Sequence, residues 1–228
     1  QAAYECFVEM KRALDSAKKL GIPRREAEIL SRLDTPEKIQ DYIGALPTNF
    51  EPEGDTCLSV VETLRKRRAH CIEGAFVAAC ALWVHGEPPL LMDLQARGDD
   101  DHVVTLFRRG RCWGAISKTN HVWLRWRDPI YRSLRELAMS YFHEYVMESK
   151  KTLRHYSRAI DLRRFDSKLW VTNPDDCWDV AAACDDAKHY PLLTPTQARR
   201  LRLRDAMEIK AGKMIEYKAP NPKTASRY

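Results

Sequence analysis

The sequence predicts an α+β fold in which helices pack on a small antiparallel sheet, with a mostly helical extension at the C-terminal end. Three observations support this prediction. Helical spacing and capping residues dominate the first part of the chain, strand-like segments follow between residues 90 and 126, and a basic, turn-rich region makes up the last third. We therefore expect a domain over residues 1–150 and a basic, mainly helical extension over residues 151–228.

The helices expected before residue 85 cover residues 2–20, 35–46, 56–68 and 71–84. The first ends at Gly21, because glycine commonly stops a helix. The second begins at Thr35, a good N-cap, with Pro36 in its first turn. The fourth has the sequence CIEGAFVAACALWV, which is small and apolar almost all round and is typical of a helix buried on most sides.

The strand-like segments are Leu90–Leu94, His102–Phe107, Cys112–Ser117 and His121–Trp126. Arg108–Arg111 between the second and third segments is expected to be a four-residue hairpin loop. If Phe107 then pairs with Cys112, His102 lies directly opposite Ser117. Cross-strand partners are close enough for one side chain to orient the other.

Two later helices are expected. One opens at Asp128-Pro129 and reaches about Glu148, with Asp128 as an N-cap rather than a catalytic acid. The other begins at Thr194, with Pro195 at its first position and Gln197 completing a capping box.

Composition indicates a globular protein with its own core, since 44% of the 228 residues are hydrophobic. No apolar run approaches the roughly 20 residues that span a bilayer. The first residues lack the charged start and apolar stretch of a signal peptide. We therefore expect neither a membrane-spanning helix nor a signal peptide.

The seven cysteines have no tight paired spacing and predict neither a disulfide framework nor a zinc site. Cys177, Cys184 and His189 do not match the spacing of a standard metal site. The cysteines therefore indicate a reduced, cytoplasmic protein, and we expect no metal and no cofactor.

The charge is uneven along the chain. Residues 1–150 carry 22 basic and 22 acidic residues, whereas residues 151–228 carry 16 and 10, so the net charge of +6 lies in the last third. Such a region attracts phosphates or acidic proteins, although a solvated helix face explains it as well. Its aromatic residues do not interleave with arginines as in a known RNA- or DNA-binding module.

Cys71 stands at the expected first turn of a helix, a position that favours a reactive thiol. The free N–H groups and the positive end of the helix dipole stabilise a thiolate there. The preceding Arg67 and Arg68 act in the same direction. Cys80 lies further along the helix, where this help is missing, and is assigned to packing. On these grounds alone, a buried and unreactive Cys71 remains the alternative.

Three segments resemble the transglutaminase-like core, a branch of the papain-type Cys/His enzymes. They are HCIEGAFVAACAL with Cys71, DHVVTLF with His102, and CWGAIS after it, and the resemblance covers about residues 35–130. It implies that Cys71 is the nucleophile and His102 the general base. The family has an Asp four residues after a Trp, and that position, four residues after Trp113, is Ser117 here.

A serine at the third position changes the chemistry that the resemblance implies. Its hydroxyl can fix the tautomer of His102, but it cannot stabilise an imidazolium with a negative charge. Asn120 and the Asp99–Asp101 loop are the alternatives for this role. His121 is the second histidine to test, whereas His70 is expected to point away from the thiol.

The resemblance implies a cysteine enzyme that acts on an amide or related acyl group through a thioester. The acyl group would pass to water, as in a peptidase or amidase, or to an amine, as in a transglutaminase. The substrate would be a protein, a peptide or a small amide. The alternative is a catalytically silent transglutaminase-like domain that binds a protein or peptide. Nucleic-acid binding through the last third is a third possibility.

Overall fold

The computed structural model describes residues 2–219, with side chains from residue 7 onward, and confirms the α+β class. The helices are α1 (Ala2–Lys19), α2 (Arg24–Ser31), α3 (Pro36–Ala45), α4 (Val60–Lys66), α5 (Cys71–Val84), α6 (Leu134–Met139), α7 (Trp178–Asp185), α8 (Pro195–Arg199) and α9 (Ala206–Gly212). The strands are β1 (Leu90–Ala96), β2 (His102–Arg109), β3 (Cys112–Ile116), β4 (Arg127–Tyr131), β5 (Val146–Met147), β6 (Lys150–Lys151), β7 (Leu153–Ser157), β8 (Ile160–Asp161) and β9 (His189–Pro191).

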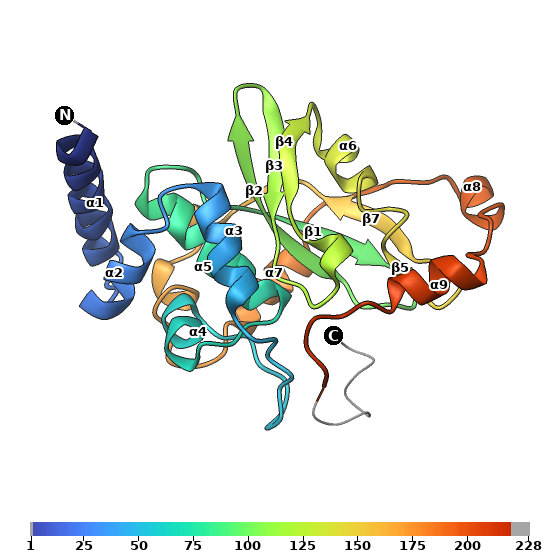
Figure 1. Cartoon of the computed structure of the whole chain (residues 1–228), viewed down its shortest axis with the longest axis horizontal. Helices are drawn as coiled ribbons and strands as arrows, with labels where there is room; N and C mark the ends of the chain where they lie inside the picture. Colours follow the sequence, from blue (N-terminus) through green and yellow to red (C-terminus); the bar gives the residue numbers. More distant parts are fainter. Residues whose placement is uncertain (1, 220–228) are drawn as a thin grey trace.

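The central sheet has the strand order β4-β3-β2-β1-β7-β9, and β8 also pairs with β1. All of these strand pairs are antiparallel. Figure 1 shows α1–α5 on one side of the sheet and α6 on the other. Strand β2, which begins at His102, therefore lies inside the sheet with a neighbour on each side.

The sheet separates two hydrophobic cores. Val103 and Phe107 of β2 pack in the first core with α5, whereas Val104 and Leu106 pack in the second core with α6. This alternation follows from the two-residue repeat of a strand. The Thr105 hydroxyl also donates a hydrogen bond to a carbonyl of α5 at 2.8 Å. Helix α5 is thereby held against the strand that carries His102.

Caps and composition explain where the predicted helices begin. The Thr35 side chain accepts a hydrogen bond from Lys38 N at 3.3 Å, with Pro36 at the first position of α3. Helix α5 has the expected bounds and is buried along nearly its whole length. Helix α2 was not expected, because its short, charged sequence lacks a capping side chain.

The predicted register of the β2–β3 hairpin is wrong by two residues. Arg109 pairs with Cys112 and Phe107 with Gly114, so the loop consists of Gly110 and Arg111. Gly110 has a φ of 58°, a conformation that favours glycine in tight hairpins. The arginines that suggested a loop instead extend the strands, where Arg108 lies over the Trp113 ring at 4.7 Å. A shift of two residues leaves every side chain on its predicted face.

Two expected elements between residues 118 and 148 are also wrong. Residues Val122–Leu124 form a short 3-10 helix rather than part of a strand. Asp128 lies in β4, where its carboxylate accepts a hydrogen bond from the Trp126 indole at 2.9 Å, and does not cap a long helix. Strand β4 is a sheet edge, where a proline such as Pro129 is tolerated. The helix that follows is short and is capped by Ser133.

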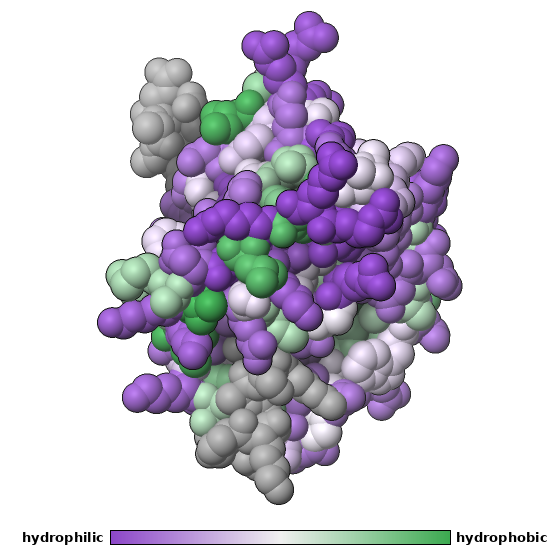
Figure 2. Space-filling view, turned by 90° about the vertical axis from the view of Figure 1, so that its right-hand side faces the viewer, coloured by the Kyte–Doolittle hydropathy of each residue, from purple (hydrophilic) through white to green (hydrophobic). Residues whose placement is uncertain are grey.

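The last third contributes both helices and strands. Its strands β7 and β9 extend the central sheet across the boundary expected at residue 150, and Trp170 and Val171 join the first core. The predicted cap of α8 is confirmed, since Thr194 and Gln197 form a capping box. The face that carries α8 and α9 is mostly hydrophilic, with small apolar areas (Figure 2). Within residues 2–219 no helix has the length and apolar character to cross a membrane.

Candidate active site

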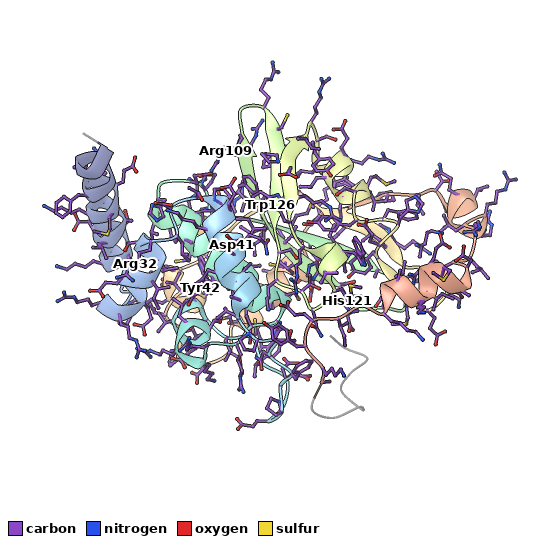
Figure 3. The ribbon with its side chains drawn as sticks, in the orientation of Figure 1. Arg32, Asp41, Tyr42, Arg109, His121 and Trp126 are labelled. Atoms are coloured by element: carbon purple, nitrogen blue, oxygen red, sulfur yellow. The ribbon has the colours of Figure 1, made fainter. Side chains whose placement is uncertain are left out.

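A pocket of about 180 Å³ opens where the N-terminus of α5 meets the first residue of β2. It lies away from the hairpin turn: Arg109 marks the hairpin end of the sheet in Figure 3, and His121 lies at the pocket. Its wall includes residues 69–71, 99–102, 118–121 and 144–146. The fold thus brings four distant segments around one cavity.

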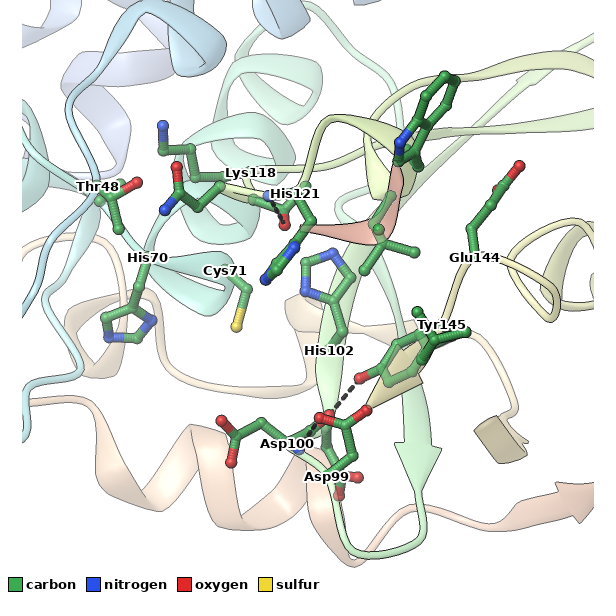
Figure 4. Close-up of a pocket in the computed structure, with 18 residues that line it drawn as sticks. Thr48, His70, Cys71, Asp99, Asp100, His102, Lys118, His121, Glu144 and Tyr145 are labelled. Carbon is green, nitrogen blue, oxygen red and sulfur yellow. Dashed lines mark hydrogen bonds between the residues drawn. The ribbon is translucent and has the colours of Figure 1, made fainter. Parts of the chain in front are cut away.

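Cys71 is the first residue of α5, and the imidazole rings of His102 and His70 are both near enough to its thiol to act on its charge. In Figure 4 its sulfur points into the space between the two imidazole rings. Burial on its own would raise the pKa of this thiol. The hydrogen bonds and positive charges of the two histidines outweigh burial and lower the pKa of Cys71 to about 5. Cys71 is therefore a thiolate near neutral pH.

His102 and Ser117 are brought together as the sequence predicts. The ring is buried, and its Nε2 lies 2.7 Å from the Ser117 hydroxyl, which leaves Nδ1 for the thiol. Gln40 of α3 fixes Ser117 in turn: its amide group accepts from Ser117 N at 2.9 Å and donates to Ser117 O at 3.0 Å. A hydroxyl can donate or accept, so Ser117 can orient His102 in either protonation state.

His70, the N-cap of α5, also points toward the thiol, contrary to our expectation. Its Nε2 lies 2.8 Å from the Thr56 carbonyl oxygen and 3.3 Å from the Glu73 carboxylate. Burial would lower the pKa of His70. The hydrogen bond with Cys71 and the charge of Glu73 outweigh burial and raise the pKa to about 10. His70 is therefore an imidazolium at neutral pH.

Glu73 provides the negative charge that His70 needs. Its side chain is fully buried, yet four groups donate hydrogen bonds to its carboxylate: Asn49 Nδ2 at 3.1 Å, Thr56 Oγ1 at 2.8 Å, Leu58 N at 3.1 Å and His70 N at 3.0 Å. A buried carboxylate is tolerated when it is paired and hydrogen-bonded in this way. The spacing of His70 and Glu73, three residues apart at a helix start, is the sequence signal that could have identified this pair.

The alternatives for the third position have other roles. The Asn120 side chain accepts hydrogen bonds from Glu216 N and Tyr217 N, at 3.1 and 2.7 Å, and holds the C-terminal segment beside the pocket. In the loop before β2, Asp101 accepts from Ala96 N at 2.8 Å and thereby shapes the turn. Ser117 is thus the partner of His102, while Asn120 and Asp99–Asp101 contribute to the pocket wall.

Three further groups in the wall complete the site. Lys118 is buried and packs against Gly74 of α5, and its ammonium group donates a hydrogen bond to the Leu46 carbonyl at 2.5 Å. Burial lowers the pKa of Lys118 to about 8. Burial, followed by the charge of His102, lowers the pKa of His121. The Thr48 hydroxyl is buried and has no hydrogen-bond partner among the described residues. It is a donor available to a ligand.

Cys177 and Cys184, the cysteines considered with His189 as a metal site, differ from Cys71. Burial raises the pKa of Cys177 and of Cys184 to about 12, and His189 pairs with Asp93 at 2.9 Å. Within residues 2–219, no group of three His, Cys, Asp or Glu side chains is arranged to hold a metal ion.

The site therefore offers a thiolate, an imidazole oriented through its far nitrogen, and a second imidazole held by a buried carboxylate. Such a set can attack an electrophilic carbon and move a proton. No protein-family profile matches the chain, and no curated protein sequence matches it either.

Proposed function

We propose that this protein is a transglutaminase-like cysteine enzyme that acts on an amide or related acyl group through a thioester at Cys71. One observation supports the proposal above all. A thiol with a pKa of about 5 lies at a helix N-terminus beside His102, whose Nε2 is held by Ser117. This is the arrangement that a cysteine nucleophile and its acid–base partner require.

In the first step, the Cys71 sulfur attacks the carbonyl carbon of the substrate and a C–S bond forms. The C–N bond then breaks, and His102 donates a proton to the departing amine. The negative charge on the carbonyl oxygen is stabilised by the Cys71 N–H, in the first turn of α5, where backbone N–H groups lack intrahelical partners. We assign the second donor to the unpartnered Thr48 hydroxyl in the same pocket.

In the second step, water or an amine attacks the thioester, His102 accepts its proton, and Cys71 leaves as a thiolate. Water gives a peptidase or amidase, and an amine gives an acyltransferase. The half-exposed Trp123 at the pocket wall is a surface for a protein, peptide or small amide substrate. A thiolate is preserved best in a reducing compartment, so we propose a cytoplasmic location.

A silent binding domain is the second candidate, and Ser117 is the observation that favours it. A hydroxyl lacks the charge with which the family's Asp stabilises an imidazolium. In that case the same pocket would bind a protein or peptide without turning it over. Nucleic-acid binding through the last third is a third candidate, tested by whether a gel shift weakens with salt.

The deciding experiment uses hydroxylamine as acceptor and a panel of glutaminyl peptides and activated esters as acyl donors. We expect hydroxamate formation and an acyl adduct on the intact protein, both lost in Cys71→Ala. Cys112→Ala is the matched control, because Cys112 is also half-buried but lies at the hairpin. A Cys71 that reacts with iodoacetamide but forms no adduct with any donor would favour the silent binding domain.

A further inference from the structure

Two imidazoles flank the Cys71 sulfur in Figure 4, and their other contacts differ. His102 meets a hydroxyl through its second nitrogen, whereas His70 meets a carbonyl and a buried carboxylate. We propose that His70 is a second, permanently charged imidazole that holds Cys71 as a thiolate, so that His102 alone carries the proton that moves. The inference rests on the proposed function and assigns a role that the family resemblance does not include.

The contacts of His70 place one of its ring hydrogens on Nε2 and put carboxylates, which favour the charged ring, beside that nitrogen. A carbonyl oxygen can only accept, so Nε2 of His70 carries a hydrogen directed at Thr56 O, 2.8 Å away. Glu73 Oε1 at 3.3 Å and Glu51 Oε1 at 3.5 Å place two carboxylates beside the same nitrogen. Only 13% of the His70 side chain is exposed, so water screens these charges little. The remaining nitrogen, Nδ1, faces the thiol in Figure 4.

The titratable groups around the thiol come from several elements. His70 and Glu73 belong to the start of α5, Glu51 to the preceding loop, and His102 to β2. The other pocket groups are Asp99, Asp100, Asp101, Lys118, His121, Glu144 and Tyr145. Among all of these groups, His70 and His102 are the two that lower the pKa of Cys71. The thiol therefore has two imidazole neighbours, and one of them, His70, is itself paired with the buried Glu73 carboxylate.

The division of roles between His70 and His102 has a chemical consequence. During acylation, His102 loses its proton to the departing amine, and in a two-member site that step would remove the positive charge beside the sulfur. Here His70 remains an imidazolium throughout, because the Thr56 carbonyl keeps a hydrogen on Nε2 and the Glu73 carboxylate beside that nitrogen favours the charged ring. When the thioester is cleaved, Cys71 leaves as a thiolate beside an imidazolium that is already present. A stabilised thiolate is the better leaving group.

The test is the pH profile of Cys71 alkylation, measured site by site with iodoacetamide and mass spectrometry. We expect His70→Gln to raise the alkylation midpoint by at least about one pH unit, because the amide can still donate to Thr56 O but carries no charge. His102→Gln should leave the midpoint well below the ordinary thiol value of 9.0. A His70→Gln midpoint equal to that of the parent, or a return to 9.0 in His102→Gln alone, overturns the proposal.

His85→Asn is the matched control, since His85 lies at the opposite end of α5 and its Nε2 also contacts a backbone carbonyl, that of Leu30 at 3.1 Å. We expect this variant to retain the parent midpoint. If His70→Gln does not fold, NMR of the unsubstituted protein decides: the His70 ring should remain protonated at pH 8. A ring that titrates below pH 7 contradicts the proposal.

These readouts need no substrate. A thiolate that depends on His70 in a protein without acyl transfer would therefore contradict the proposed function, while the role of His70 in holding Cys71 as a thiolate would stand. Conversely, acyl transfer with a His70 that titrates normally would contradict the inference alone.

Discussion

Helix α5 carries two cysteines, nine residues apart, whose environments are opposite. Cys80 is fully buried among apolar residues, and burial raises the pKa of its thiol far above the ordinary value of 9.0. Cys71, at the start of the same helix, has a pKa lowered to about 5. The difference teaches that the polar groups at the helix start, rather than the helix itself, determine the reactivity of a cysteine.

The two regions also differ in how they tolerate buried polarity. Around Cys80 the helix consists of residues such as Phe76, Ala79 and Leu82, which need no partners. The first turn buries Glu73 and most of His70, and this is possible because donors from the preceding loops satisfy the carboxylate. The apolar part of α5 thus anchors the helix in the core, while the first turn supplies the chemistry.

The largest expected effect is in thiol reactivity. At pH 7 we expect Cys71 to react with iodoacetamide at least about 1,000-fold faster than Cys80, because one is a thiolate and the other a buried thiol. Mass spectrometry of peptides after timed labelling measures both rates in one sample. If Cys71 and Cys80 are alkylated at comparable rates in the folded protein, the start of α5 does not make its cysteine more reactive.

The second prediction concerns the close packing of the first turn. A Cβ at Gly74 would lie 2.3 Å from the Cβ of Lys118, so Gly74→Ala should lower the free energy of unfolding by about 1–3 kcal/mol. Gly44→Ala in α3 is the control. Its Cβ would meet only Gln40 at 3.9 Å, and we expect a gain of about 0.5–1 kcal/mol from helix propensity. Urea unfolding measures both changes, and equal effects would contradict the packing argument.

The third prediction concerns the anchor of His102. Ser117→Ala removes the hydroxyl at Nε2 and should lower the acyl-transfer rate by about 10-fold to 100-fold, because a mobile imidazole is a poorer acid and base. Ser117→Asp should instead extend Cys71 alkylation to lower pH, since a carboxylate favours the imidazolium and hence the thiolate.

His102→Ala should abolish the extension of Cys71 alkylation to lower pH that Ser117→Asp produces. An alkylation profile that Ser117→Asp leaves unchanged, in a folded protein, would show that residue 117 does not act through His102.

The fourth prediction concerns the pH dependence of stability. The pKa of Cys71 is lowered from 9.0 to about 5. The stabilisation that this thiolate adds to the free energy of unfolding is therefore fully present above pH 9 and is lost as the pH falls through 5. The pKa of His70 is raised from 6.5 to about 10. The stabilisation that this imidazolium adds to the free energy of unfolding is therefore fully present below pH 6.5 and is lost as the pH rises through 10. Between pH 6.5 and 9 the two slopes cancel, because folded and unfolded states bind the same number of protons.

In the parent protein, these two groups together leave the free energy of unfolding independent of pH between pH 6.5 and 9. In Cys71→Ser only the His70 contribution remains, so we expect the free energy of unfolding to fall as the pH rises over this range. The free energy of unfolding, measured in urea at pH 6.5, 7.5 and 8.5 for both proteins, checks the difference, from which all other titrating groups cancel. If the free energy of unfolding of Cys71→Ser changes with pH in parallel with that of the parent, Cys71 and His70 do not form a thiolate–imidazolium pair.

Local sequence signals predicted the elements that depend on local chemistry. Proline and a capping hydroxyl marked the starts of α3 and α8, and the unbroken apolar run marked α5. The contact of His102 with Ser117 was also predicted, although the register was not. An even shift keeps the two side chains on one face, and the diagonal neighbours of a sheet still lie within reach.

What the sequence could not predict depends on contacts between distant segments. The spacing of His70 and Glu73 is a local signal, but the orientation of the His70 ring also depends on the Thr56 carbonyl, fourteen residues away, which no local pattern indicates. Strands β7 and β9 have mixed polarity, and their place in the sheet follows from the pairing of β7 with β1 and of β9 with β7. Asp128-Pro129 has the composition of a helix start, yet the sheet edge made it a strand.

The strand order has a consequence for how the protein is made. A ribosome completes Cys71 and His102 early, but β1, the neighbour of β2, remains an open edge until β7 has been synthesised, and β7 in turn awaits β9. Open strand edges invite pairing with other chains. The nascent chain must therefore keep this edge unpaired over some sixty residues of translation, from Ala96 to Leu153. The central sheet is therefore complete only after the last third of the chain has been synthesised.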